Sequence, residues 1–268
     1  MRAAAHRAAI AALLLAGRAL WLVPVLLLLL GWALLPVLVE LPAYQLPRLA
    51  EVAATGWRLL VDGTLAQAIG ASLLRLAVAF LIGAGLGLLL GLSMAASRVL
   101  TLLLEPIVAF FQAVAGIAWI PLAIVWFGFG DGPVLFVVAN AIFFIVLYNT
   151  LLGVHGIQRV LPRAVRTLGG TRWQVLREVL LPGAMVSVLA GLRTGLAFGW
   201  RALVAVELIA ANSGMGFLTL SASRNYQSEV VVVAIVVVGL LWLAMDRLLL
   251  RPIERRTVVR WGMVRQTR

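Results

Sequence analysis

The chain contains no lysine and no cysteine, and all 22 of its basic residues are therefore arginines. A phosphate-binding loop of the G-x-x-x-x-G-K type needs a lysine to reach the nucleotide phosphates, so this chain cannot provide that nucleotide site. Disulfides, thiolate metal sites and cysteine nucleophiles are excluded as well. The two histidines, His6 and His155, lie far apart in the sequence, and no hydrolytic triad is visible. We therefore predict a chain that is not an enzyme and that holds no metal and no cofactor of its own.

Charged residues are also scarce, at 12% of the 268 residues, whereas 63% are hydrophobic. A soluble domain of this length cannot bury so much apolar surface. Several uncharged runs reach the length of about 20 residues that a helix needs to cross a membrane. The sequence predicts an all-α membrane protein with six transmembrane helices. We expect them near 19–39, 76–97, 106–130, 132–154, 185–211 and 230–250.

The net charge of +12 does not indicate nucleic-acid binding, because short cytoplasmic loops of membrane proteins collect arginine. Placing both termini in the cytoplasm puts most of the arginines on that side. We expect membrane lipid, and no nucleic acid, among the partners. The basic N-terminus resembles a signal peptide, but Arg18 interrupts its apolar run, and we predict a first span that is retained. The longest predicted connection on the outer side of the membrane, residues 41–63, has room for one short amphipathic helix.

Small residues recur at every fourth position in two of the predicted spans. Such a spacing stacks them along one side of a helix and lets a neighbouring backbone come close. We interpret both stripes as packing surfaces between helices that contact each other or close neighbours. The glycines concerned are Gly83, Gly87 and Gly91 in one span, and Gly191, Gly195 and Gly199 in the other.

Polar residues inside the predicted spans are candidates for a translocation path. Arg201 falls near the middle of its span, where an ionisable group costs about 2.5–3.5 kcal/mol on insertion scales and usually faces a partner or a wet cavity. We expect Arg201, with Arg193 and Glu207 on the same helix, to border a cavity that favours an anion. An intramembrane ion pair, or snorkelling of Arg193 to the cytoplasmic face, is the alternative. Gln112 and Asn140 either line the same cavity or bond across a helix interface.

A polar segment between the fourth and fifth predicted spans has the signals of two short helices. Thr171, followed three residues later by Gln174, predicts a capping box, so a helix should start after Gly170 and run toward Pro182. Gly169 can close the preceding helix. Trp173 then lies on an exposed elbow, where it anchors either a partner protein or the membrane surface.

The spacing in this segment resembles a known motif. Gly169 is followed by nine residues, then Val179, one residue, and Leu181-Pro182. This resembles the second half of the EAA loop of permease subunits of ATP-binding cassette (ABC) importers, E-A-A-x-x-x-G, nine residues, I-x-L-P. The stretches 118–130, 191–193 and 203–210 are similar to the nitrate, sulfonate and taurine branch of the type I importer permeases, and the resemblance covers roughly residues 65–268. One departure is Arg163-Ala164-Val165 where the family has Glu-Ala-Ala, which puts in doubt the ion pair of that glutamate with the ATPase.

The resemblance implies a type I ABC importer permease fold, in which this loop is a coupling helix that docks on a separate ATPase. It implies a homodimer, two cytoplasmic ABC ATPase subunits that bind ATP and Mg²⁺, a periplasmic substrate-binding protein and a bacterial inner membrane. The solute would be small and anionic, of the nitrate, sulfonate or taurine type. Residues 1–64 would precede a core at 65–250, with the coupling loop at 155–182 and a basic tail at 251–268. The residues expected to couple to the ATPase are Gly169, Gly170, Thr171, Arg172, Trp173, Gln174, Leu181 and Pro182.

Two other classes of function remain as alternatives. A stand-alone secondary transporter or channel would use the intramembrane charges for ion coupling. No inverted repeat is apparent in the sequence, however, and the polar double helix would then lack a purpose. A membrane-embedded enzyme is disfavoured because nucleophiles and metal ligands in a suitable pattern are missing.

Overall fold

The computed structural model describes residues 22–39, 42, 44–114, 116–158, 160–250 and 252. Helices form the regular structure throughout this part of the chain, as the sequence predicts. The predicted cytoplasmic lead-in and nearly all of the predicted basic tail lie outside it. The helices are α2 (Leu22–Leu38), α3 (Leu49–Val61), α4 (Thr64–Ala96), α5 (Arg98–Ala113), η1 (Gly116–Trp119), α6 (Ile120–Phe127), α7 (Asp131–His155), α8 (Val160–Thr167), α9 (Arg172–Gln174), η2 (Val175–Leu180), α10 (Leu181–Ala210), α11 (Met215–Arg224), α12 (Ser228–Met245) and η3 (Asp246–Leu250).

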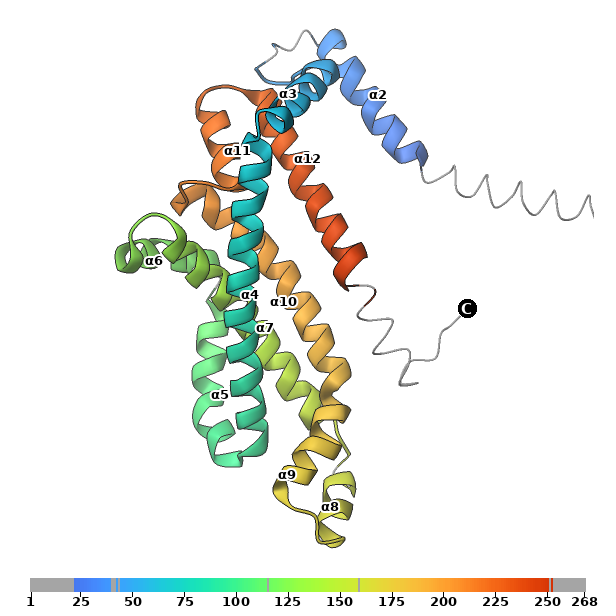
Figure 1. Ribbon diagram of the computed structural model, residues 1–268, viewed down its shortest axis with the longest axis vertical. Coiled ribbons are helices and arrows are strands. Elements are labelled where there is room, and N and C mark those ends of the chain that lie inside the picture. Colours follow the sequence, from blue (N-terminus) through green and yellow to red (C-terminus); the bar gives the residue numbers. More distant parts are fainter. Residues whose placement is uncertain are drawn as a thin grey trace, which may run out of the picture.

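The core of the molecule is helix α7, which packs against both α4 and α10 (Figure 1). Its side chains at Val134, Val138 and Ile142 are fully buried. Because α7 is apolar on nearly all sides, it can lie in lipid or among other helices, and in this structure α4 and α10 cover much of it. We call α4, α7 and α10 the three-helix core.

Both glycine stripes face α7. On α4, a Cβ added at Gly87 would lie 2.7 Å from the carbonyl oxygen of Phe143, and one added at Gly91 would lie 2.9 Å from Cβ of Thr150. At Gly83 the added carbon would overlap the carbonyl oxygen of Ala139. Such distances leave no room for any side chain, so the glycines let the α4 and α7 backbones touch.

The second stripe packs against a neighbouring face of α7. An added Cβ would lie 2.5 Å from Cβ of Asn149 at Gly191, 3.2 Å from Val146 at Gly195 and 2.6 Å from Ile142 at Gly199. Val146 contacts both stripes, since an added Cβ at Gly87 would lie 3.1 Å from it. The two stripes therefore each pack against α7, on adjacent faces of that helix.

The predicted count of six spans is not confirmed. Four helices of the described part are long and apolar enough to cross a membrane, at 64–96, 131–155, 175–210 and 228–248. α5 and the η1–α6 segment make a fifth only if they count as one span, because the chain bends by 89° between them. The predicted span at 106–130 is corrected accordingly: α5 starts earlier, at Arg98, and stops at Ala113. Gly116 weakens the helix there, and Pro121, which lacks an N–H, suits the first turn of a new one.

The two ends of the three-helix core carry different structures (Figure 1). At one end α8 and α9 form a short projection between α7 and α10. At the other end lie α3, which confirms the short helix predicted in the loop 41–63, and α11, which the sequence did not predict. α12 returns along the core from α11 and packs against α3.

Candidate functional site

The projection between α7 and α10 turns on two adjacent glycines. Gly169 has a φ of +83°, and its N–H donates to the carbonyl of Arg166 at 3.0 Å, while the N–H of Gly170 donates to the carbonyl of Val165 at 2.9 Å. This pair of bonds is a Schellman motif, and it confirms that Gly169 closes α8. Gly170 is required as well, because an added Cβ would lie 2.5 Å from Cγ1 of Val165. The elbow is therefore fixed and not a loose loop.

The predicted capping box follows directly and is confirmed. The backbone N–H of Thr171 donates to Oε1 of Gln174 at 2.7 Å, and the N–H of Gln174 donates to Oγ1 of Thr171 at 3.3 Å. The two side chains satisfy free N–H groups at the start of α9.

The helix that starts at α9 does not end at Pro182, which corrects the prediction of a separate short helix. It continues through the π-helical turn η2 into α10, and the N–H of Leu181 donates to the carbonyl of Leu176, five residues earlier. This wider turn brings Pro182 to the first turn of α10, where its missing N–H costs little. Leu181 and Pro182 thus join the elbow rigidly to the three-helix core.

The projection exposes both apolar and basic side chains. We call residues 160–174 the knob. Trp173 is 64% exposed, and Leu168 and Val160 of the knob are exposed as well. Arg163 and Arg166 on α8 are exposed too. An aromatic side chain left open on a rigid elbow, with arginines nearby, has the composition of a protein-binding hot spot.

The residues predicted for a translocation path occupy different environments. Arg201 is exposed, with its guanidinium carbon 5.6 Å from the ring centroid of Phe198. Arg193 pairs instead with Asp246 at 2.9 Å, linking α10 to η3. Such a pair is the alternative that the sequence left open for an intramembrane arginine. The remaining two are Gln112, exposed on α5, and Asn140, half-buried on α7.

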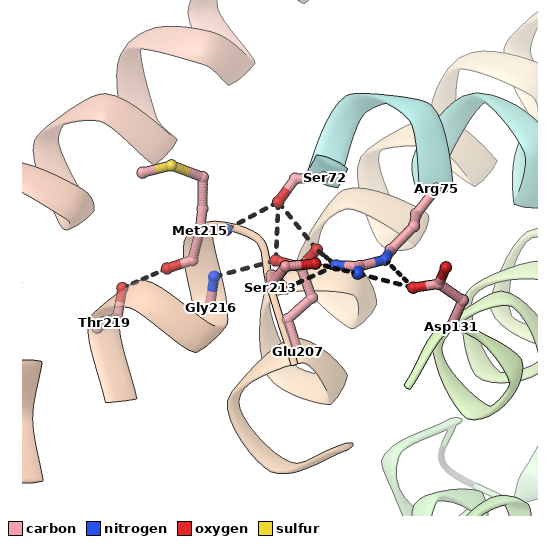
Figure 2. Close-up of polar contacts among 8 residues, drawn as sticks. All are labelled: Ser72, Arg75, Asp131, Glu207, Ser213, Met215, Gly216 and Thr219. Carbon is pink, nitrogen blue, oxygen red and sulfur yellow. Dashed lines mark hydrogen bonds and ion pairs between the residues drawn. The ribbon is translucent and has the colours of Figure 1, made fainter. Parts of the chain in front are cut away.

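Glu207 differs from the other predicted path residues because its side chain is fully enclosed by protein. Nη1 of Arg75 donates to Oε1 of Glu207 at 2.9 Å (Figure 2). The same nitrogen donates to the backbone carbonyl of Ser213, and Nη2 donates to its Oγ, both at 2.6 Å. Nε of Arg75 donates to Asp131 at 2.7 Å. Glu207 therefore does not face a cavity in this structure, but joins α4, α7 and α10 at one end of the core.

Glu207 also receives hydrogen bonds from a second residue of α4 and from α11. The hydroxyl of Ser72 on α4 lies 2.8 Å from Oε2, and the backbone N–H of Gly216 donates to the same oxygen at 3.0 Å. The N–H of Met215 in turn donates to Oγ of Ser72 at 2.9 Å. These N–H groups belong to the first turn of α11, whose N-cap residue, Gly214, has no side chain to cap them. Side chains from two other helices, Glu207 on α10 and Ser72 on α4, therefore cap the N-terminus of α11.

The sequence reasoning did not assign roles to Ser72, Arg75, Asp131 and Ser213 in this network. Arg75 did carry a signal, because an ionisable residue in an apolar helix normally has a buried partner. The identity of that partner was not accessible, since Arg75 and Glu207 are 132 positions apart in the chain.

Comparison with known proteins identifies the architecture. Residues 83–257 match the family described as binding-protein-dependent transport system inner membrane component. The taurine transport system permease protein of Escherichia coli (strain K12) is 37% identical over 221 residues, which cover 82% of this chain and 79% of that protein. A permease named for aliphatic sulfonates, from Bacillus subtilis (strain 168), is 31% identical over 230 residues, with coverages of 86% and 83%.

Other matches support the same assignment. A bicarbonate transport system permease protein of Synechococcus elongatus is 31% identical over 179 residues, which cover 66% of this chain and 64% of that protein. Among solved structures, a chain of the inward-facing MetNI methionine ABC transporter matches with a TM-score of 0.57 at 20% identity, covering 72% of this chain and 97% of that chain. This likeness shows the fold. The chain belongs to the family of binding-protein-dependent transport system inner membrane components, and it is an ABC importer permease of the branch that includes the taurine and sulfonate permeases.

Proposed function

We propose that this multi-pass inner membrane protein forms the path for a small anion, and that a separate ATPase drives it through the knob. The observation that carries the proposal is the exposed Trp173 on an elbow fixed at both ends. The Schellman motif holds it to α8, and the continuous helix through η2 holds it to α10. A push on Trp173 is therefore transmitted along α10 to the core and not absorbed in a loop.

The energy source follows from what the chain lacks. Without a lysine it has no phosphate-binding loop of its own, so ATP and Mg²⁺ bind to the partner. Two ATPase subunits in the cytoplasm would each receive one knob. ATP binding would draw the two knobs together and tip the spans from inward-facing to outward-facing, and hydrolysis would reset them.

The assembly follows from the same placement. A knob in the cytoplasm puts the C-terminus on that side, because the spans at 175–210 and 228–248 cross in opposite directions. The distribution of arginines favours the same side for the N-terminus. Four or five spans are few for enclosing a solute path, so a second copy of the chain would complete it around a core at residues 65–250. A periplasmic substrate-binding protein would deliver the solute at the opposite end, where α3 and α11 lie (Figure 1).

The solute class is proposed from one exposed residue and from the relatives. Taurine and aliphatic sulfonates carry a sulfonate group, and bicarbonate is also an anion; these are the solutes after which the relatives are named. Arg201 is exposed on a membrane-spanning helix, and within the described part of the chain its guanidinium lies over an aromatic ring and pairs with no carboxylate. A second copy would enclose it in a wet path, where it would attract a sulfonate. Arg193, Gln112 and Asn140 are weaker candidates for the same path.

The proposal is tested by purifying tagged protein in mild detergent together with the ATPase and binding protein of the same transport system. We expect the ATPase to remain bound and taurine uptake into proteoliposomes to need ATP. Loss of the ATPase, together with uptake that continues without ATP in an ion gradient, would instead support the stand-alone transporter. Arg201→Gln should reduce uptake while the ATPase stays bound. The control Arg98→Gln, at an exposed arginine at the start of α5, should leave uptake unchanged.

A further inference from the structure

The loop that leaves the end of α10 is held by the core at several points. We call residues 211–214 the outer loop. Ser213 receives two hydrogen bonds from Arg75, one at its backbone carbonyl and one at its hydroxyl, both at 2.6 Å. Just before the loop, the carbonyl of Ala210 accepts from the N–H of Gly130, which precedes α7, at 2.8 Å. The outer loop is therefore attached to α4 and, beside it, to the start of α7.

Helix α11 depends on the same group of residues for its direction. Its first N–H groups are bound by Ser72 and by the carboxylate of Glu207, and no side chain of its own caps it. The backbone wraps closely around that carboxylate: an added Cβ at Gly214 would overlap it, and one at Gly216 would lie 2.5 Å from Cβ of Glu207. The direction of α11 is thus set by the position of one carboxylate.

Arg75 keeps that carboxylate in place. Glu207 is fully buried, so its charge requires a cation and several hydrogen bonds close by. In the described part of the chain, Arg75 is the cation that pairs with Glu207. The other carboxylate that Arg75 contacts, Asp131, is 68% exposed, so that contact is the weaker of the two.

We propose that Arg75 is a positioning residue for transport: through Glu207 and Ser213 it holds the outer loop and α11 across the outer end of the three-helix core. This inference rests on the proposed import function, because the α11 end is the outer end only if the knob lies in the cytoplasm. Along α10, Glu207 lies about 39 Å from Leu181 at 1.5 Å per residue, so the network is remote from the knob. It acts on solute entry and not on attachment of the ATPase.

The absence of cysteine provides a direct test, because Asn212→Cys introduces a single thiol at an exposed position of the outer loop. A nitroxide spin label is attached to that thiol in the complex with the ATPase. The line width of its electron paramagnetic resonance spectrum reports the mobility of the outer loop. In the Arg75→Gln variant we expect narrower lines in the nitroxide spectrum, because the outer loop becomes more mobile. Taurine uptake should fall by about tenfold, while ATP hydrolysis and ATPase binding persist. Arg75→Lys should recover part of the uptake. The matched control is Arg193→Gln, which removes the other arginine–carboxylate pair on α10 and should leave the nitroxide unchanged.

A single substitution at Arg75 leaves a buried charge and can unfold the chain, so a second variant is needed. Arg75→Gln combined with Glu207→Gln removes both charges and should restore the thermal stability, but the loop should stay mobile and uptake low. Recovery of full uptake in the double variant would show a purely structural ion pair and overturn the inference. So would an unchanged nitroxide spectrum in a folded Arg75→Gln variant. Failure of the import function itself is seen separately, as absence of ATP-dependent uptake by the unsubstituted complex.

Discussion

The contact between α4 and α7 leads to a specific prediction about the α4 stripe. At Gly83, an added Cβ would overlap the carbonyl oxygen of Ala139 and lie 3.1 Å from its Cα. Both are backbone atoms, which cannot rotate away as a side chain can, so Gly83→Ala must push the helices apart. Gly85 lies two residues further along the same helix, with nothing within 4 Å of an added Cβ.

The size of the effect follows from comparing the two substitutions. Both gain the same helix propensity on changing glycine to alanine, about 1 kcal/mol. Gly83→Ala alone pays the cost of overpacking, about 1–3 kcal/mol. The free energies of unfolding of the two variants should therefore differ by that amount, which corresponds to a difference in Tm of about 2–12 °C.

The assay is thermal unfolding of the two purified variants in the same detergent, followed by tryptophan fluorescence. We expect Gly83→Ala to melt below Gly85→Ala, and Gly85→Ala to melt at or above the unsubstituted protein. Equal melting temperatures for the two variants would show that α4 and α7 do not touch at this stripe, and would refute the three-helix core.

Three further predictions concern the knob and the path. Gly170→Ala should lower the amount of ATPase that co-purifies, because its Cβ would lie 2.7 Å from the carbonyl oxygen of Val165 and distort the elbow; unchanged recovery would contradict this. Thr171→Ala should cost about 1 kcal/mol by removing half of the capping box with Gln174, measured as faster hydrogen exchange of the α9 amides; equal exchange rates would show that the cap is not needed. Arg201→Gln should raise the taurine concentration needed for half-maximal uptake. An unchanged concentration would show that Arg201 does not line the solute path.

The long helices were predictable where charged or polar residues mark their ends. The run 132–154 nearly coincides with α7, Asp131–His155, because ionisable residues flank it. The same reasoning placed the start of α4 too late, at 76, since Arg75 interrupts the uncharged run. In the folded chain this arginine is neutralised by Glu207, so it does not end the helix.

The knob and the buried network differ in how they could be foreseen. The capping box and the glycine closure join residues at most five positions apart, so local sequence determines them. The network joins Arg75 to partners 56, 132 and 138 positions away, which only the packed helices bring together. Sequence alone therefore predicted the local structure of the knob, but not what holds the opposite end of the core.

The central claim is that a passive membrane path receives work through Trp173, and a cross-linking experiment in the complex tests it most directly. Leu168→Cys in the knob and Val61→Cys on α3 each place the only thiol of the chain at an exposed apolar side chain, 88% and 67% exposed, at opposite ends of the molecule, and both leave Trp173 in place. A short thiol-reactive cross-linker should join position 168 to the ATPase, with a yield that changes when ATP binds, and should not join position 61. Absence of a cross-link from position 168, or an equal one from position 61, would contradict the account.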